Sequence, residues 1–208
     1  MKKQLFITLI TFSSLFVMAQ EGQKINAGVD LSWGPHYFNS KRNNPVASGI
    51  SIGYEFDYLF FFGLEVGLKG GIFNQKVEYE DINSIVRNDI YKGSYWSPFI
   101  APKIYLPVSY NNKIDRPRYL FLENKFSYTW MNMSSDRVED LSKNAHRSRF
   151  QYELKLGYQF PINNRWAMAC WIGYNSFDFS KVKPEQIKFK NSTPLEFGIG
   201  FNYIIKQD

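Results

Sequence analysis

The chain has 208 residues, which suits a single domain, and a formal net charge of +6 at pH 7. Aromatic residues make up 18% and charged residues 21%, and the mean hydropathy of -0.35 is too polar for a bundle of membrane-spanning helices. The basic residues are scattered and not interleaved with aromatics in one run, which argues against a nucleic-acid partner. One cysteine and two histidines allow no internal disulfide and no zinc-type ligand cluster, so we expect no metal and no cofactor.

The N-terminus has the features of a secretory signal peptide. Met1-Lys2-Lys3 is basic, the run from Leu5 to Met18 is apolar, and Val17-Met18-Ala19 has the small-residue pattern that signal peptidase cleaves. The apolar run is shorter than the ~20 residues of a spanning helix, which disfavours an uncleaved anchor. We expect residues 1–19 to be removed and residues 20–208 to form the mature domain.

The rest of the chain is dominated by an alternation with a period of two. Apolar side chains occupy one parity and glycine or polar side chains occupy the other, which predicts β-strands with one apolar face. Eight segments carry the pattern: Ile25–Trp33, Gly49–Tyr58, Phe62–Ile72, Tyr95–Leu106, Tyr119–Trp130, Ser148–Phe160, Trp166–Phe177 and Leu195–Ile205.

Two of these segments depart from the regular pattern. In the fourth, Pro98 and Pro102 lack the N–H donors of a ladder, which predicts bulges or irregular pairing there. In the seventh, Trp171 falls on the parity that is otherwise polar.

Strand length and spacing favour a membrane barrel over a soluble β-sandwich or a lipocalin-like cup. The segments match the ~9–11 residues of a tilted transmembrane strand and exceed the ~5–6 residues usual in soluble sheets. Long polar links occur at 34–46, 74–93, 131–147 and 178–192, and tight ones at 59–61 and 161–165. Because outer-membrane barrels have long outer loops and short periplasmic turns, we predict an all-β, eight-stranded antiparallel up-and-down transmembrane β-barrel with both termini in the periplasm. The link at 107–118 is longer than such a turn needs.

Aromatic residues near the strand ends predict two girdles at the membrane interfaces. The predicted periplasmic girdle comprises Tyr58, Phe60, Phe61, Tyr105, Tyr119, Tyr158, Phe160, Trp166 and Tyr203. The predicted outer girdle comprises Trp33, Trp96, Tyr128, Trp130 and Tyr174.

The polar parity should face the lumen, and it carries charges of both signs. Its acids are Asp30, Glu55, Asp57, Glu65, Glu123, Glu153 and Glu196, and its bases are Lys69, Lys103, Lys125, Arg149 and Lys155. The interior of an eight-stranded barrel is just wide enough for side chains to fill, and paired charges avoid leaving a poorly hydrated ion. We therefore predict a network that closes the lumen, formed by Glu65, Lys69, Glu123, Lys125, Arg149, Glu153 and Lys155. A narrow solute channel is the alternative.

Two stretches resemble known bacterial sequences. Gly49–Phe56 followed by Gly63–Leu68 is similar to the second and third strands of the outer-membrane β-barrel domain family common in Bacteroidota, often labelled porin-like or PorT-like. This resemblance implies an integral protein of the bacterial outer membrane, surrounded by lipid and lipopolysaccharide. The end of the chain resembles the C-terminal assembly signal of bacterial barrels, carried here by Glu196, Gly198, Phe201 and Tyr203. It implies the barrel assembly machinery as a partner.

One short motif suggests chemistry. His146-Arg147-Ser148 resembles the His-x-Ser pair of outer-membrane lipid A deacylases, in which the histidine would act as a base on the serine. By parity, His146 and Ser148 both face outward, but no acid is placed to orient the histidine, so we assign no catalytic residue. We expect a non-enzymatic barrel that presents its outer loops for envelope integrity, adhesion or partnership in a larger membrane complex. A lipid A-modifying acyl hydrolase is the enzymatic alternative.

Overall fold

The computed structural model describes residues 22–33, 47–59, 61–80, 86–135, 145–176 and 195–206. They form eight strands: β1 (Gln23–Trp33), β2 (Ala47–Leu59), β3 (Phe62–Glu80), β4 (Val86–Asn111), β5 (Arg116–Ser135), β6 (Ala145–Pro161), β7 (Trp166–Asn175) and β8 (Leu195–Lys206). No helix in these ranges is long and apolar enough to cross a membrane.

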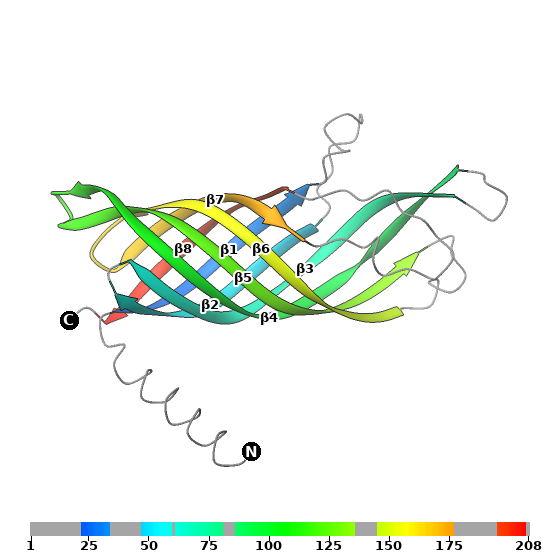
Figure 1. Cartoon of the computed structure of the whole chain (residues 1–208), viewed down its shortest axis with the longest axis horizontal. Helices are drawn as coiled ribbons and strands as arrows, with labels where there is room; N and C mark the ends of the chain where they lie inside the picture. Colours follow the sequence, from blue (N-terminus) through cyan, green and yellow to red (C-terminus); the bar gives the residue numbers. More distant parts are fainter. Residues whose placement is uncertain are drawn as a thin grey trace, which may run out of the picture.

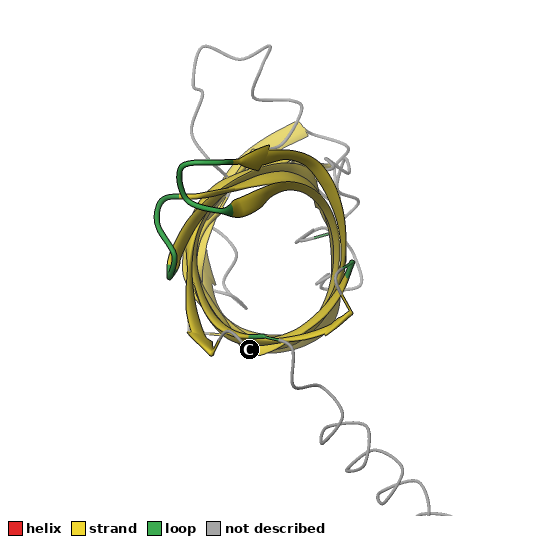
Figure 2. Ribbon diagram, turned by 90° about the vertical axis from the view of Figure 1, so that its left-hand side faces the viewer, coloured by secondary structure: helices red, strands yellow, loops and turns green. Residues whose placement is uncertain are grey.

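The eight strands close into one barrel (Figure 1). Each strand pairs antiparallel with its neighbours in sequence, and β8 pairs antiparallel with β1. Figure 2 looks along the barrel from the end at the left of Figure 1 and shows the strands as a continuous ring. The predicted eight-stranded antiparallel barrel is confirmed.

The distribution of side chains is inverted relative to that of a soluble protein. In β2, Ile50 and Ile52 are 68% and 58% exposed, whereas Ser51 between them is buried. Successive side chains of a strand point to opposite faces, so this alternation produces an apolar outer wall and a polar interior. The largest side chains with almost no exposure are polar or charged: Lys155, Glu55, Glu153, Glu196, Thr129, Asp30, Ser32 and Ser97. An apolar outer wall of this kind is what contact with lipid requires.

Trp171 faces the lumen, and small residues on neighbouring strands accommodate it. Its indole lies against Gly28 of β1 and against Gly198 and Gly200 of β8. A Cβ atom at Gly198 would overlap the indole ring, so the absence of a side chain permits this close approach. The seventh predicted segment departs from the regular alternation because Trp171 points into the lumen.

The central strands are longer than the sequence predicts. β3 continues to Glu80 and β4 begins at Val86, and their pairing extends through most of the predicted link 74–93. β5 and β6 likewise take up part of the predicted link 131–147. These extensions are visible at the right of Figure 1. The alternation fades beyond Phe73 because backbone pairing outside the membrane needs no apolar outer face.

The predicted link 107–118 is also mostly strand. β4 and β5 meet in a turn at 112–115, and Asp115 at its end has a φ of 57°, a left-handed conformation that aspartate tolerates. The register of β4 against β5 shifts between Pro107 and Ser109, which makes Val108 a bulge. The long link is thus a bulged hairpin.

At the two earlier prolines of β4 the structure shows irregular pairing, one of the two predicted outcomes, and no bulge. The register of β4 with β3 is continuous through Pro98 and Pro102. Pairing with β5 is interrupted at both prolines, but the register on either side of them is unchanged. Each proline therefore removes ladder contacts on one side without bending the strand out of alignment.

Two predicted girdle residues lie inside the barrel. Tyr105 is buried, and Tyr119 packs edge-on against it with ring centroids 5.5 Å apart. Their assignment to the girdle was wrong because they share the inward parity of Lys103 and Glu123. Other predicted girdle residues form exposed ring pairs on the outer wall: Trp96 with Trp130 at 4.2 Å, and Trp166 with the half-buried Tyr203 at 4.9 Å. The side chains of Trp33, Tyr58 and Phe60 lie outside the described part.

Candidate functional site

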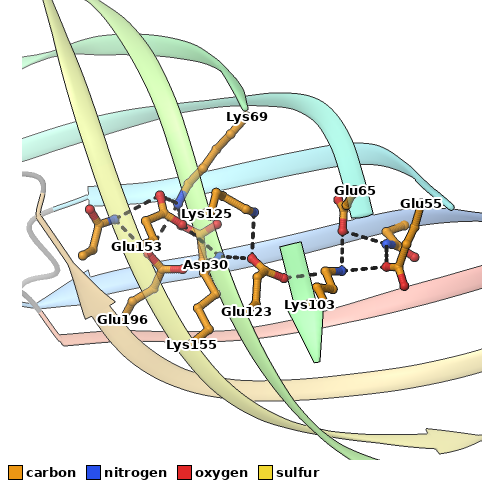
Figure 3. A network of polar contacts seen from close by, with 12 residues as sticks. Asp30, Glu55, Glu65, Lys69, Lys103, Glu123, Lys125, Glu153, Lys155 and Glu196 are labelled. Carbon is orange, nitrogen blue, oxygen red and sulfur yellow. Dashed lines mark hydrogen bonds and ion pairs between the residues drawn. The ribbon is translucent and has the colours of Figure 1, made fainter. Parts of the chain in front are cut away.

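A chain of ion pairs runs through the interior of the barrel (Figure 3). We call it the lumen network, formed by Lys24, Asp30, Glu55, Asp57, Glu65, Lys69, Lys103, Glu123, Lys125, Glu153, Lys155 and Glu196. Its members project inward because they occupy the polar parity of their strands.

Lys69 of β3 joins strands that are not its neighbours in the wall. Its Nζ lies 3.0 Å from Asp30 of β1, 2.8 Å from Glu153 of β6 and 3.4 Å from Glu196 of β8. The strands beside β3 are β2 and β4, so all three contacts cross interior space. The three carboxylates are at most 1% exposed, and Lys69 is 3% exposed.

Lys155 of β6 joins this group to the next. Its Nζ lies 2.8 Å from Glu196, 2.9 Å from Glu153 and 3.5 Å from Glu123 of β5. Lys125 adds a second ammonium 3.3 Å from Glu123. The Lys155 ammonium also lies 5.2 Å from the centre of the Trp171 ring, within range of a cation–π interaction.

Lys103 of β4 continues the network toward the end of the barrel where β1 begins and β8 ends. Its Nζ lies 3.4 Å from Glu123 and 2.8 Å from Glu55 of β2, and it also pairs with Glu65 of β3. Lys24 of β1 completes the series, 3.6 Å from Glu55 and 2.6 Å from Asp57. Glu123 therefore links the two halves of the network, since it contacts lysines in both.

Neutral donors add hydrogen bonds to three of the buried carboxylates. The Asn26 amide donates to Glu55 at 2.6 Å and to Glu65 at 2.7 Å, and the Tyr105 hydroxyl donates to Glu55 at 2.5 Å. The Asn175 amide donates to Glu196 at 2.8 Å. Burying a charge is costly unless it is paired and hydrogen-bonded, and these contacts offset that cost.

Aromatic rings fill space beside the network. Tyr105 and Phe121 form a buried cluster with Ala169, and Tyr119 and Trp171 pack against it. Their signal was present in the sequence, because each lies on the polar parity of its strand. For Tyr105 and Tyr119 this parity signal was overlooked, because both residues lie near a strand end, where girdle aromatics are expected.

The structure brings most of the predicted network residues together in the lumen: Glu65, Lys69, Glu123, Lys125, Glu153 and Lys155. Arg149 lies in β6 opposite Thr129, but its side chain is outside the described part. Five further members, Asp30, Glu55, Asp57, Lys103 and Glu196, were predicted as lumen charges, and Lys24 is new. Lys24 precedes the predicted strand start at Ile25, although its parity matches that of Asn26.

The residues of the predicted assembly signal divide between the two faces of β8. Glu196 and Gly198 face the lumen, against the lysines and Trp171 respectively. Phe201 is exposed on the outer wall, and Tyr203 packs against Trp166. Recognition by the assembly machinery stays a prediction.

The His-x-Ser motif lies near the start of β6. Ser148 is exposed, and its hydroxyl lies 2.9 Å from that of Tyr128 on β5. The His146 side chain falls outside the described part. In the ranges that the structure describes, no three His, Cys, Asp or Glu residues are grouped to hold a metal ion.

A family model and the solved structure of Neisserial surface protein A (NspA) agree with this architecture. The family model described as outer membrane protein beta-barrel domain matches residues 6–204. NspA is similar in structure with a TM-score of 0.53 and 9% identity, over 88% of this chain and 95% of that chain. The N-terminal β-barrel domain of Pseudomonas aeruginosa OprF aligns with a TM-score of 0.45 and 10% identity, over 88% and 98% of the two chains. Pseudomonas aeruginosa OprG aligns with a TM-score of 0.46 and 14% identity, over 89% and 97%.

No curated protein sequence matches the chain significantly. At these low identities, the likeness to NspA concerns the fold alone, and the Bacteroidota origin stays a prediction. The match to the family model covers nearly the whole chain, including β1 to β7 and β8 as far as residue 204. The chain therefore belongs to the outer-membrane β-barrel domain family, whose members reside in the bacterial outer membrane.

Proposed function

We propose that this protein is a non-enzymatic outer-membrane barrel whose lumen is closed to solutes and whose outer hairpins are displayed to the surroundings. The observation that carries the proposal is the lumen network. It joins side chains of seven strands, β1 through β6 and β8, across the interior.

The dimensions and chemistry of the interior support closure. Barrels of about eight strands have interiors that side chains can fill, whereas water-filled porins use about 16–18 strands. Lys69 and Lys103 each contact three carboxylates from different strands, so their ammonium groups occupy the bore. The alternation of sign along the network also differs from the single-sign rings that select ions in open pores.

The difference between the two ends of the barrel supports an orientation. The start of β1 and the end of β8 pair at the same end as the turns 112–115 and 162–165. The long extensions of β3, β4, β5 and β6 lie at the opposite end. Since periplasmic turns are short and outer loops are long, we infer that the termini are periplasmic and that the extended hairpins face outward.

The displayed hairpins suit a role in envelope integrity, adhesion or partnership with a larger membrane complex. Lipid and lipopolysaccharide surround such a barrel, and the barrel assembly machinery would insert it. Ser148 is hydrogen-bonded to Tyr128, and no described feature favours acyl hydrolysis.

Conductance tests the closed lumen directly. The mature protein is refolded, its folding is verified by heat-sensitive electrophoretic migration, and it is placed in a planar bilayer at high salt. We expect no stable steps and no swelling of proteoliposomes in small sugars. Reproducible open steps would establish the narrow-channel alternative. An altered acyl pattern in the lipid A mass spectrum of a deletion strain would instead favour the hydrolase.

A further inference from the structure

A groove lies between the β4–β5 turn and the β6–β7 turn, at the end of the barrel where β1 begins and β8 ends. It has a volume of about 620 Å³, and its lining includes Lys113, Ile162, Arg165, Trp166 and Tyr203. We propose that it binds an anionic phospholipid of the phosphatidylglycerol type, with the phosphate at Arg165 and Lys113 and the acyl chains on the adjoining outer wall. The site requires membrane residence but not a closed lumen, so the two proposals can fail separately.

Hydrogen bonds hold the two turns together and give the groove a defined shape. The Arg116 guanidinium, at the start of β5, donates to the backbone carbonyls of Asn163 at 3.4 Å and Asn164 at 3.0 Å. The Asn163 side-chain oxygen accepts from the backbone N–H groups of Arg165 and Trp166, both at 2.8 Å. An asparagine that caps its own turn in this way fixes the backbone that carries Arg165.

The charge of the groove matches a phosphate. Lys113 and Arg165 are exposed, and neither forms an ion pair with a carboxylate in the described part of the chain. Asp115, the acid of the β4–β5 turn, accepts a hydrogen bond from Tyr110 at 2.8 Å. Arg165 has a neutral neighbour instead, the Tyr203 hydroxyl at 3.5 Å.

The same charge distribution selects among headgroups. A zwitterionic phosphatidylethanolamine brings an ammonium group that needs a carboxylate, and the groove lining contains none. A net anionic headgroup keeps the attraction of both basic groups without that penalty. Cationic groups near an anionic membrane surface each contribute to lipid binding in this way.

The apolar side of the groove continues into the outer wall. Trp166 is 43% exposed and its ring packs against Tyr203, and Phe201 and Ile199 follow along β8 as exposed side chains. Tryptophan and tyrosine favour the headgroup level of a membrane. A phosphate at Arg165 therefore places the acyl chains of the same molecule against this wall, which a free phosphate ion could not use.

Quenching of tryptophan fluorescence by brominated lipids tests the proposal. The barrel is refolded in phosphatidylcholine vesicles that contain either brominated phosphatidylglycerol or brominated phosphatidylethanolamine. We expect phosphatidylglycerol to associate about fivefold more strongly for each basic group engaged, which corresponds to about 1 kcal/mol. Trp166→Phe should remove most of the difference in quenching between the two lipids, because Trp166 is the tryptophan at the groove.

Charge variants complete the experiment. Arg165→Gln should lower the preference about fivefold, and Arg165→Lys should restore most of it. Lys92→Gln is the matched control, since it removes one exposed basic residue at the opposite end of the barrel. Any one of three outcomes would overturn the proposal. The two lipids could quench equally, or the preference could survive Lys113→Gln combined with Arg165→Gln. Alternatively, millimolar inorganic phosphate could displace the lipid. Heat-sensitive migration verifies that every variant is folded.

Discussion

The Lys69 ammonium of β3 lies 2.8 Å from the Glu153 carboxylate of β6, although β4 and β5 separate their strands in the wall. The contact therefore braces opposite parts of the barrel through its interior. Both side chains are almost fully buried, so neither charge has water as an alternative partner.

We predict that Lys69→Met destabilises the barrel strongly. The change leaves Asp30, Glu153 and Glu196 with one fewer shared cation, and removing one member of a buried ion pair costs about 3–5 kcal/mol. Reversible urea unfolding in lipid vesicles measures the loss. Lys113→Met is the control on an exposed lysine; in phosphatidylcholine vesicles, which hold no anionic lipid for Lys113 to bind, it should change stability by no more than about 0.5 kcal/mol. Similar losses for the two variants would show that the contacts of Lys69 contribute no special stability.

We predict that a cation on the outer wall is tolerated according to its depth. Val66 lies in the middle of Phe62–Ile72, the part of β3 with the membrane-type alternation, whereas Val108 lies at the bulge near the end of the β4–β5 hairpin. Both are exposed apolar residues. Val66→Arg should cost about 2–4 kcal/mol and Val108→Arg about 0–1 kcal/mol, because the penalty falls from the bilayer centre to the interface. The same unfolding assay compares them, and equal costs would contradict the assigned membrane position.

We predict that Gly198 is required because of Trp171. A methyl group at position 198 overlaps the indole, and overpacking of this kind costs about 1–3 kcal/mol in Gly198→Ala. In a Trp171→Leu background the same change should cost at least about 1 kcal/mol less, since contacting residues are energetically coupled. A double-mutant cycle measures this coupling. Additive effects would mean that Gly198 serves another purpose, such as recognition by the assembly machinery.

We predict cleavage between Ala19 and Gln20 during export. The basic start, the short apolar run and the residues before Gln20 support this site. The intact mass of protein extracted from outer membranes identifies the mature N-terminus. Retention of Met1 in that mass would exclude the signal-peptide interpretation.

The sequence was sufficient to predict the barrel because lipid imposes a strict rule on each strand. Ile50, Ile52 and their counterparts must be apolar where the wall meets lipid, and this produces a readable period of two. Beyond Phe73 and beyond Leu106 the rule no longer applies. Pairing there depends on backbone hydrogen bonds that any residue can make, so the sequence did not reveal the strand ends.

The members of the lumen network could be predicted by parity, but their partners could not. Glu123 is adjacent to Lys125 on one face of β5, yet it also contacts Lys103 and Lys155 on the two flanking strands. These pairings depend on the stagger between strands, which the alternation does not specify. The groove at Arg165 was equally hidden, because it forms only when the bulged β4–β5 hairpin reaches the β6–β7 turn.

The position of Glu196 on the last strand ties two steps of folding together. β8 pairs with β1 only when distant parts of the chain meet, which is the slowest kind of contact to form. The same event delivers the Glu196 carboxylate to Lys69 and Lys155, and brings Gly198 beneath the Trp171 indole. Closure of the wall and completion of these lumen contacts are therefore one step. A barrel left open between β1 and β8 lacks the Glu196 bridge between Lys69 and Lys155 and leaves Glu153 to join the two ammonium groups. The lost contacts favour completion over a stable half-formed cylinder.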